Sequence, residues 1–386
     1  MQVSRARYLV SEAGRQALRS LPADLRQHSP HRLAEELRRS FPAEQASALA
    51  EQLSLRAKAT DRFGSDLGFI YSAEGLEMMT HPRVAQRRAR RLEALGAPVA
   101  DLTCGLGGDL RAVVDAGSRA VGIERDEATA LLASANVDGR VVRGEAVYPP
   151  FDLLKVALLI DPSRRLGASR RFDPAAFSPP WDVTMSLATS ARAAVVKGPP
   201  GIDLKHVPSD AEVEFVQLGR SLRESAAWFG GDSVPGLRRA VLLDQGPSLT
   251  STAPEAAPQT SAPGHFFFDP ESCVTRAGLV RHLAYELDAR LMDPQVAYLT
   301  AESPAFHPMA ATFEVLDSLP FSLSRLKTRL RERGWRPDEI RRRAFPVEPD
   351  ELRRLLGRLE GDRVTLVCTT IAGQRTVFVA RRVEPS

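Results

Sequence analysis

A glycine-rich segment at residues 101–109 is the part of the sequence whose residue types point most directly to chemistry. It follows an apolar stretch at 99–102 that predicts a short strand, and a helical pattern comes after it. Glycine has no Cβ, so Gly105, Gly107 and Gly108 let the backbone of this turn approach a bound ligand closely. Alone, a turn of this kind indicates only a nucleotide-binding loop.

Acidic residues stand at the ends of the next predicted strands. Glu124 lies 19 residues after Gly105, at the end of the strand predicted at 120–124, where a carboxylate can accept hydrogen bonds from the two ribose hydroxyls of an adenosine. Glu145 follows the third predicted strand and can accept a hydrogen bond from the adenine amino group. Since open α/β sheets bind ligands at the carboxyl ends of their strands, we expect these acids to share one crevice with the glycine-rich loop.

The order of these residues separates two classes of cofactor. A dinucleotide dehydrogenase needs a third glycine at position 110, where this chain has Leu110. Asp101 stands four residues before Gly105; a carboxylate there suits the methionine end of S-adenosylmethionine (SAM) and has no role with a pyrophosphate. We therefore expect SAM, with NAD as the weaker alternative. The predicted cofactor-binding residues are Asp101, Thr103, Cys104, Gly105, Gly107, Gly108, Asp109, Glu124, Arg125, Glu145, Ala146 and Asp161.

These motifs resemble a known family. From Asp101 to Pro162 the sequence resembles the class I SAM-dependent methyltransferases, most of all their RNA-modifying branches, although Thr103 stands where the commonest pattern has glycine. Over most of its length the chain is similar to bacterial class I methyltransferases with a C-terminal THUMP-like domain, and distantly to trimethylguanosine synthases. The resemblance implies that helices before the sheet help to cover the cofactor, near residues 69–76 and 80–82.

Asp161 and Pro162, at the end of the fourth predicted strand, are the predicted catalytic residues. Methyl transfer from a sulfonium needs in-line placement of the acceptor more than acid–base help, because the leaving group is already cationic. The Asp161 carboxylate and a backbone carbonyl of this turn can accept hydrogen bonds from a substrate amine and direct its lone pair at the methyl group. Cys104 lies inside the cofactor loop, where a nucleophile would face the wrong ligand, so we interpret it as a packed residue and expect nitrogen rather than carbon methylation.

Four further residues are weaker candidates for substrate binding. Ser163 and Arg164 follow the catalytic turn, at a position that is often proline or aromatic in amino methyltransferases. Trp181 ends the run Ser-Pro-Pro-Trp at 178–181, which we interpret as a structural turn, with a substrate lid as the alternative. Lys197, at the end of the fifth predicted strand, either meets a phosphate or, as we favour, is a surface lysine of a turn.

The elements that position these residues predict an α/β fold with a seven-stranded Rossmann-like sheet. Residues 1–92 have helical periodicity and predict an N-terminal helical subdomain, and residues 93–244 predict the methyltransferase domain. Residues 245–319 predict a linker and a connecting helical or hairpin segment, with a helix at 276–291. Residues 320–386 predict a small α+β THUMP-like module. The predicted strands of the large sheet are 99–102, 120–124, 140–143, 156–160, 193–197, 212–217 and 239–244.

The module at 320–386 is rich in arginine. Helices are expected at 322–333 and 349–359, and a hairpin at 364–370 and 376–380. Residues 325–343 carry nine cations and three acids, while apolar residues at helical spacing would form the buried stripe, so the cations point outward. A basic helix with an exposed Trp335 suits an RNA backbone, and the alternative is a solvated arginine-rich face. Arg329, Arg333 and Arg336 are the predicted RNA contacts.

The composition of the chain argues against several other classes of protein. The chain of 386 residues has a formal net charge of +4, and no apolar run approaches the roughly 18 residues of a membrane span. Its three cysteines are far apart, which suits a reducing compartment and disfavours a disulfide framework, and no histidine cluster suggests a metal. The first residues do not form a secretory signal, so we expect a cytoplasmic protein without a metal or a membrane partner.

The leading hypothesis is therefore a SAM-dependent enzyme that methylates a base nitrogen in tRNA or rRNA. A small-molecule methyltransferase is the first alternative, although it would leave the basic C-terminal segment without a purpose. The second alternative is a SAM-binding or RNA-binding protein without turnover, because Ser163 and Arg164 depart from the usual catalytic pattern.

Overall fold

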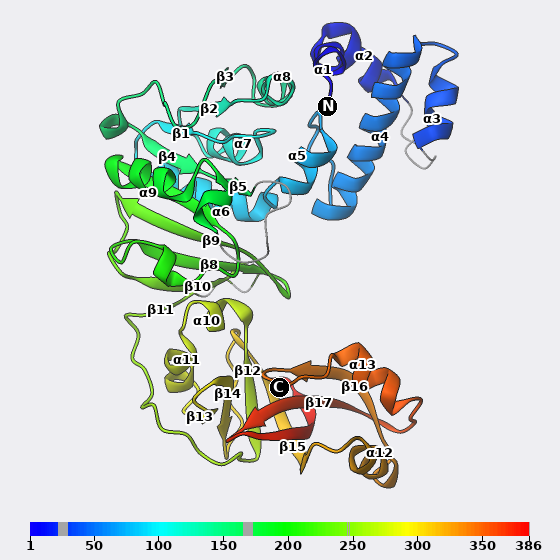
Figure 1. Cartoon of the computed structure of the whole chain (residues 1–386), viewed down its shortest axis with the longest axis vertical. Helices are drawn as coiled ribbons and strands as arrows, with labels where there is room; N and C mark the ends of the chain where they lie inside the picture. The colour runs from blue at the N-terminus through cyan, green and yellow to red at the C-terminus, as the bar shows by residue number, and fades with distance from the viewer. Residues whose placement is uncertain (22–29, 165–172, 245, 247, 386) are drawn as a thin grey trace. The chain divides into compact units, whose positions relative to one another are not determined.

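The computed structural model describes residues 1–21, 30–164, 173–244, 246 and 248–385. The chain forms two compact units (Figure 1). Residues 1–212 and 225–236 make up the first unit, and residues 213–224 and 237–386 make up the second. None of the described helices is both long and apolar enough to cross a membrane.

Six described helices precede the first strand, as the helical periodicity of this region predicts. Ser11 and Ser72 cap two of them, because each hydroxyl accepts a hydrogen bond from a backbone N–H in the first turn. Leu9, Leu49 and Leu53 are fully buried where the longer helices pack together. The helices are α1 (Val3–Val10), α2 (Glu12–Ser20), α3 (Pro30–Leu37), α4 (Ala43–Phe63), α5 (Ala73–Met78) and α6 (Pro82–Ala94).

A nine-stranded sheet follows, with the strand order β11-β10-β8-β9-β7-β4-β1-β2-β3. Its central strands β7, β4, β1, β2 and β3 are parallel neighbours, and helical crossovers connect several of them. The strands are β1 (Val99–Asp101), β2 (Ala120–Glu124), β3 (Val141–Arg143), β4 (Ala157–Ile160), β7 (Ala193–Gly198), β8 (Glu212–Leu218), β9 (Ser221–Gly230), β10 (Arg238–Leu242) and β11 (Ser248–Thr250). The helices among them are α7 (Gly108–Asp115), α8 (Glu127–Asn136) and α9 (Trp181–Ser190).

All seven predicted strands are present, but the predicted number for this sheet is too low. The two additional strands are β9 and β11. The first residues of β9 include Arg223 and Glu224, so its polar start hid a strand that is buried from Glu224 to Phe229. Strand β11 has only three residues and lies in a stretch rich in proline, serine and threonine. In β9 burial in the sheet overrides weak local propensity. Strand β11 lies at the edge of the sheet, and only Leu249 of its three residues is buried.

Short elements complete the first unit. A two-stranded sheet pairs β5 (Ser163–Arg164) with β6 (Phe177–Ser178) in antiparallel register. Among the described residues, the connections contain the 3-10 helices η2 (Leu153–Lys155), η3 (Pro174–Ala176) and η4 (Leu204–His206). Strand β5 begins two residues after Asp161, so only Asp161 and Pro162 separate it from the end of β4.

The second unit contains a seven-stranded sheet with the order β13-β14-β12-β15-β18-β17-β16. The predicted C-terminal hairpin is confirmed, since β17 and β18 pair in antiparallel register up to Ile371 and Gln374. The strands are β12 (Phe266–Pro270), β13 (Arg290–Asp293), β14 (Val296–Ala301), β15 (Ala310–Pro320), β16 (Trp335–Arg342), β17 (Asp362–Ile371) and β18 (Gln374–Val383). The helices are α10 (Ser272–Arg276), α11 (Val280–Glu286), α12 (Leu323–Glu332) and α13 (Pro349–Leu356).

The structure differs from the expectations for this region at two places. The helix predicted at 276–291 is interrupted, because Gly278 adopts a positive φ of 67° between α10 and α11, and strand β13 begins at Arg290. The boundary predicted at residue 320 falls at the end of β15, which pairs with β12 on one side and with β18 on the other. Strands from both sides of that boundary therefore share one sheet.

Candidate active site

A cavity of about 890 Å³ lies at the carboxyl ends of β1, β2, β3 and β4, as expected for an open α/β sheet. The segments after these four strands line it, and together they contribute residues 101–106, 108, 109, 123–126, 144–147, 159, 161 and 163. A second wall comes from helix α5 and its flanks, at residues 72–75 and 78–80, and a third from residues 178–180. The wall around α5 lies within the region that the family resemblance associates with cofactor cover.

The glycine-rich turn borders the cavity with its backbone. Gly105 and Gly107 have φ values of 53° and 87°, in the left-handed region that glycine adopts without strain. A Cβ added to Gly105 would meet no heavy atom within 4 Å, so this position faces open space. A Cβ on Gly107 would stand 3.0 Å from Val137, which shows that Gly107 is packed against α8 and its neighbourhood rather than exposed to the cavity.

Thr103 connects the two segments in which cofactor and catalytic residues were predicted. Its backbone N–H donates to Oδ1 of Asp101 over 3.1 Å, and its Oγ1 accepts a hydrogen bond from the backbone N–H of Asp161 over 2.6 Å. Glycine, the usual residue here, has no side chain that could accept this bond. The departure from the family pattern therefore ties the loop after β1 to the end of β4.

Asp101 is a buried carboxylate beside the cavity, with 1% of its surface exposed. Burial is the main cause that raises the pKa of Asp101 to about 8, and the negative charge of Asp109 adds to the shift. The backbone N–H of Thr103 and the charge of Lys197 act in the opposite direction. A cationic ligand would favour the ionised form of Asp101 in the same way, so this carboxylate is suited to hold a positively charged group.

A buried network of ion pairs connects Arg88 to Asp161. The Arg88 guanidinium bonds Oδ1 of Asp109, while Oδ2 of Asp109 accepts from Thr80 over 2.7 Å and from the Lys197 ammonium over 3.1 Å. Lys197 also donates to Oδ2 of Asp161 and to the Thr80 hydroxyl. The network therefore joins α6, α7, β7 and the end of β4 at the wall of the cavity.

The interpretation of Lys197 as a surface residue is wrong. Only 7% of its surface is exposed, and its ammonium lies between Asp109 and Asp161. The sequence predicts that this lysine lies near the end of a strand. It does not predict its partners Asp161 and Asp109, because they lie 36 and 88 residues away along the chain. A phosphate contact for Lys197 is also unsupported, because two carboxylates already surround it.

Asp109 lines the cavity, but its two oxygens bind protein groups. Burial alone would raise the pKa of Asp109, yet the charges of Arg88 and Lys197 outweigh burial and hold its pKa well below the usual range. Asp109 is therefore ionised at neutral pH and binds two cations. Arg88 is itself 2% exposed, and nothing in the arginine-rich run at residues 83–91 distinguishes it in sequence from its neighbours.

The acids predicted for ribose and adenine both line the cavity. Glu124 accepts a hydrogen bond from the backbone N–H of Asp126 over 2.8 Å, and partial burial raises its pKa. Glu145 and Ala146 follow β3 at the rim, where Glu145 is exposed. Arg125 also lines the cavity and donates to the Ser178 hydroxyl over 2.9 Å, so it connects the end of β2 to the wall at 178–180.

The segment after Asp161 is divided between the cavity and the core. Ser163 lines the cavity, whereas Pro162 is buried and does not, and the side chain of Arg164 lies outside the described residues. Trp181 is 4% exposed; its indole N–H donates to the carbonyl oxygen of His206 over 2.7 Å and its ring packs against Phe177. The structural interpretation of Trp181 is supported, although residues 178–180 before it do line the cavity.

Sequence reasoning missed Arg62, which supports the wall around α5. The Arg62 guanidinium at the end of α4 donates to the carbonyl oxygens of Glu77 over 2.7 Å and Met79 over 2.9 Å, and to that of Leu76. Cations near the last carbonyls of a helix stabilise its C-terminus, and here they hold the segment that carries Met79 and Thr80 to the cavity. No spacing in the sequence distinguishes this arginine.

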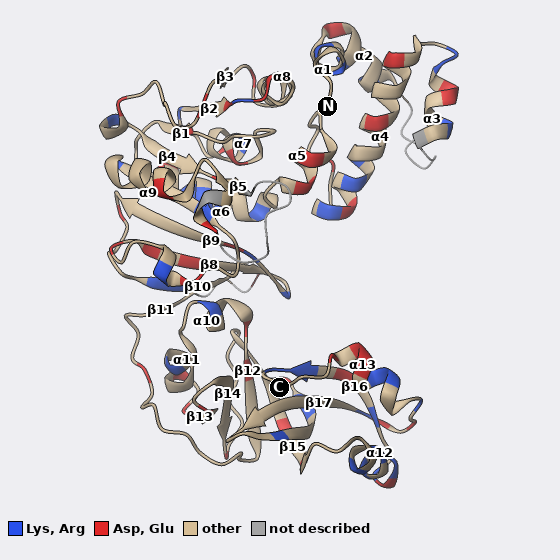
Figure 2. Ribbon diagram, in the orientation of Figure 1, with Lys and Arg blue, Asp and Glu red and all other residues tan. Residues whose placement is uncertain are grey.

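The predicted RNA contacts of the second unit are only partly exposed. Basic positions follow one another along α12 in Figure 2. Arg329 forms an ion pair with Asp317, and the Arg333 guanidinium lies 5.8 Å from the centre of the Trp335 ring. Trp335 is half-buried, so the expectation of an exposed aromatic residue is wrong, and Trp335 and Arg336 belong to strand β16 rather than to the basic helix.

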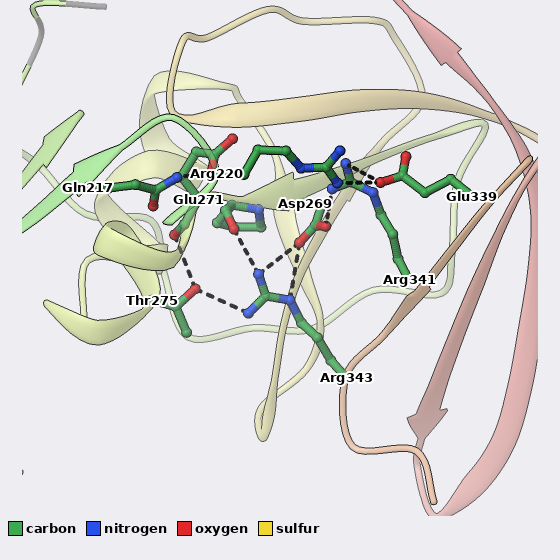
Figure 3. A network of polar contacts seen from close by, with 9 residues as sticks. Gln217, Arg220, Asp269, Glu271, Thr275, Glu339, Arg341 and Arg343 are labelled. Carbon is green, nitrogen blue, oxygen red and sulfur yellow. Dashed lines mark hydrogen bonds and ion pairs between the residues drawn. The ribbon is translucent and has the colours of Figure 1, made fainter. Parts of the chain in front are cut away.

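The arginines at residues 341–343 have intramolecular partners, as Figure 3 shows for two of them. Arg341 and Arg343 bind the two oxygens of Asp269 over 2.5 Å and 2.8 Å, and Arg342 pairs with Glu348. The bonds to Asp269 connect β16 and the residue after it to the end of β12. Three of the nine cations counted in the basic segment therefore stabilise the fold of the second unit.

Comparison with known proteins identifies the family of the chain. A family model described as THUMP domain-like matches residues 310–382, and one described as a domain of unknown function (DUF8688) matches residues 2–59. An uncharacterized SAM-dependent methyltransferase of Mycobacterium tuberculosis, from strains CDC 1551 and H37Rv, is 32% identical over 299 residues, which cover 74% of this chain and 81% of the relative. The crystal structure of a candidate methyltransferase from Porphyromonas gingivalis W83 is 22% identical with a TM-score of 0.73, covering 99% of this chain and 98% of that one. At that identity the likeness shows a shared fold.

Proposed function

Since this chain belongs to the S-adenosylmethionine-dependent methyltransferases, we propose that it transfers the methyl group of SAM directly to a base nitrogen in tRNA or rRNA. Asp161 is the residue proposed to receive the methyl acceptor. The single observation that carries this proposal is the partly exposed Asp161 carboxylate in the wall of the cavity, fixed on one side by Lys197.

The residues around the cavity fit SAM chemically. Asp101 provides a buried carboxylate for a cationic group, and Glu124 and Glu145 provide acceptors that suit ribose hydroxyls and an adenine amino group. The open space beside Gly105 leaves room where a side chain would otherwise intrude. When bound, SAM supplies an electrophilic methyl group on a leaving group that is already cationic, so departure of the sulfur needs no general acid.

Asp161 is suited to orient a nitrogen acceptor. Its side chain is 39% exposed and borders the cavity, whereas the backbone N–H of the same residue is held by Thr103. A carboxylate that accepts a hydrogen bond from an N–H points the nitrogen lone pair away from that bond, toward an electrophile opposite. Fixing this geometry before reaction lowers the entropic part of the barrier.

Cys104 supports nitrogen over carbon as the methylated atom. Methylation of a pyrimidine carbon commonly uses a thiolate nucleophile, and only the thiolate is reactive. Burial holds the pKa of the Cys104 thiol well above its usual value, and Asp101 and Glu124 add negative charge nearby. Cys104 therefore stays a neutral, packed thiol and offers no covalent route.

An RNA substrate is supported by the exposed part of the basic helix α12. Arg325 and Arg331 are exposed and form no ion pair within the part of the chain that the structure describes. Such cations suit a sugar–phosphate backbone, where they release counterions on binding. The match of residues 310–382 to THUMP-like domains covers this helix.

The test compares modified nucleosides in RNA from a wild-type strain and from a strain that lacks the gene. Total tRNA and rRNA are digested and the nucleosides are separated and weighed by mass spectrometry. We expect one methylated nucleoside to disappear and to return when wild-type protein is supplied, but not when Asp161→Ala is supplied. Asp182→Ala, which removes an exposed carboxylate on α9, is the matched control and should restore the nucleoside. An unchanged nucleoside profile would overturn the RNA proposal in favour of a small-molecule substrate or of binding without turnover.

A further inference from the structure

Lys197 is buried, whereas most lysines lie at the protein surface. It is the next-to-last residue of β7, which lies next to β4 in the sheet, and its ammonium contacts Asp161 at the cavity wall. Elements that approach from other directions supply its remaining contacts: Thr80 before α6 and Asp109 in α7. A lysine that is 7% exposed loses most of its hydration, so its charge must be compensated by these partners.

The oxygens of Asp161 are used unequally. Oδ2 accepts from the Lys197 ammonium, and the backbone N–H of Asp161 donates to Thr103. Oδ1 receives no hydrogen bond from the residues that the structure describes, and the side chain borders the cavity with 39% of its surface exposed. One oxygen is thus fixed by the protein, while the other is available to a molecule in the cavity.

The charges explain why a cation is needed at this place. Asp101, Asp109 and Asp161 converge on one wall, and Asp109 is already held by Arg88 on its other oxygen. Asp161 has no ion pair other than the one with Lys197 among the described residues. Without that ammonium, the negative charge of Asp109 would repel the Asp161 carboxylate, and no ion pair with a described residue would hold it in place.

We propose that Lys197 is a positioning residue that holds Asp161 by one carboxylate oxygen and leaves the other to accept a hydrogen bond from the N–H of the methyl acceptor. This inference rests on the proposed role of Asp161 and narrows the substrate: the acceptor must carry an N–H at the reacting nitrogen. An oxyanion or phosphate acceptor would be repelled by the free carboxylate oxygen. In the transfer, the nitrogen lone pair forms the N–CH3 bond, the electron pair of the breaking C–S bond stays on sulfur, and the surplus proton leaves through Asp161 to water.

The kinetic test uses the full chain, labelled SAM and total RNA from a strain that lacks the gene. Lys197→Met should lower kcat by about 100-fold with little change in the KM for RNA, because the acceptor still binds but is misdirected. Lys197→Arg keeps a cation with several donors and should recover most of the lost rate. Lys205→Met is the control: it removes an exposed lysine whose ammonium lies 2.8 Å from Asp203, and it should react like wild type.

A second test reads the contact itself without any substrate. The chain has five lysines, so selective labelling of lysine with ¹³C and ¹⁵N gives a spectrum of five ammonium groups, in which Lys197→Arg identifies the signal of Lys197. We expect this ammonium to exchange its protons slowly, as a buried and hydrogen-bonded group does, and to shift strongly in Asp161→Asn. The signal of Lys205 should not move in that variant.

The outcomes separate this inference from the proposed substrate. If wild type transfers no label to RNA, the RNA proposal is overturned, and the lysine spectrum alone decides the inference. If wild type is active but folded Lys197→Met keeps its kcat, Lys197 does not position Asp161 and the inference is wrong. It is equally wrong if the Lys197 signal ignores Asp161→Asn or exchanges as fast as that of Lys205.

Discussion

At the scale of single residues, Asp101 has the least favourable environment of the described carboxylates at the cavity. It is almost fully buried, and its environment raises its pKa from 3.8 to about 8. When such a buried carboxyl group ionises, the free energy of unfolding falls. A bound cationic ligand offsets this loss, because it stabilises the ionised form. The buried position of Asp101 therefore lowers the stability of the ligand-free protein and favours binding of a cationic ligand.

Without ligand, Asp101→Asn should become more stable than wild type as the pH rises. Because the folded pKa is raised, the unfolded chain releases this proton near pH 4 and the folded chain near pH 8. The stability that the protonated Asp101 contributes is present below pH 4 and is lost as the pH rises to about 8. Wild type should therefore lose up to about 1.4 kcal/mol per pH unit relative to the variant across this window. Urea unfolding of both proteins at several pH values measures the difference.

A pH-independent difference between these two proteins would show that Asp101 ionises normally. Glu145→Gln offers the matched control, because Glu145 borders the same cavity but is exposed. Its stability should follow that of wild type at every pH. The control separates the effect of burial from a general effect of removing an acid at this site.

The sequence predicts which carboxylates reach the cavity but not what holds them. Asp101, Glu124 and Asp161 stand at the ends of apolar strands, and the topology of a parallel sheet brings such ends together. Lys197 and Arg88 could not be assigned in this way, because ion pairs between distant elements leave no periodic pattern. The sequence shows Thr103 as a departure from the usual glycine, but it does not predict the hydrogen bond that its hydroxyl accepts from Asp161.

At the scale of elements, Trp181 shows how one side chain anchors a helix beside the cavity. It begins α9, and its indole N–H bonds the last carbonyl of η4 at His206. The run of two prolines before it predicts a turn, and the structure has a bend at Pro179 between β6 and α9. The sequence gives no indication that residues 178–180 reach the cavity wall. The position of this segment depends on Arg125, which contacts Ser178 from the end of β2.

Trp181→Ala should destabilise the protein by about 3–5 kcal/mol, because it removes a large buried side chain together with a buried hydrogen bond. Urea unfolding followed by circular dichroism gives the value. Tyr148→Ala is the control, since Tyr148 is 82% exposed and its removal should cost little. Normal stability of Trp181→Ala with lost methylation would instead support the role of a substrate lid.

At the scale of the whole molecule, periodicity predicted the class of fold well and the limits of the parts less well. The methyltransferase sheet and the THUMP-like part are confirmed, whereas β9, β11 and the strands before residue 320 were not predicted as members of their sheets. Residues 245–319 were expected to form a linker and a connecting helical or hairpin segment, but they contain β12, β13 and β14, because short strands separated by polar turns have little periodicity. An RNA substrate stays a prediction.

A fragment of residues 264–386 should fold on its own, and a fragment of residues 320–386 should not. The longer fragment contains all strands of the seven-stranded sheet, while the shorter one loses β12 to β15 and leaves β18 without its neighbour β15. It also divides the core that Phe267, Phe313 and Phe378 form together. Calorimetric melting should show a cooperative transition for the longer fragment only. Cooperative melting of residues 320–386 would show that the boundary predicted from composition is the physical one.

The most direct test of the account is a calorimetric titration of the full chain with SAM, carried out on wild type and on Asp101→Asn. We expect saturable binding at one site in wild type, and binding at least about tenfold weaker in the variant, because a buried charge then loses its partner. The same variant is expected to be the more stable protein without ligand at high pH. Absence of binding to wild type, or equally tight binding to folded Asp101→Asn, would contradict the account.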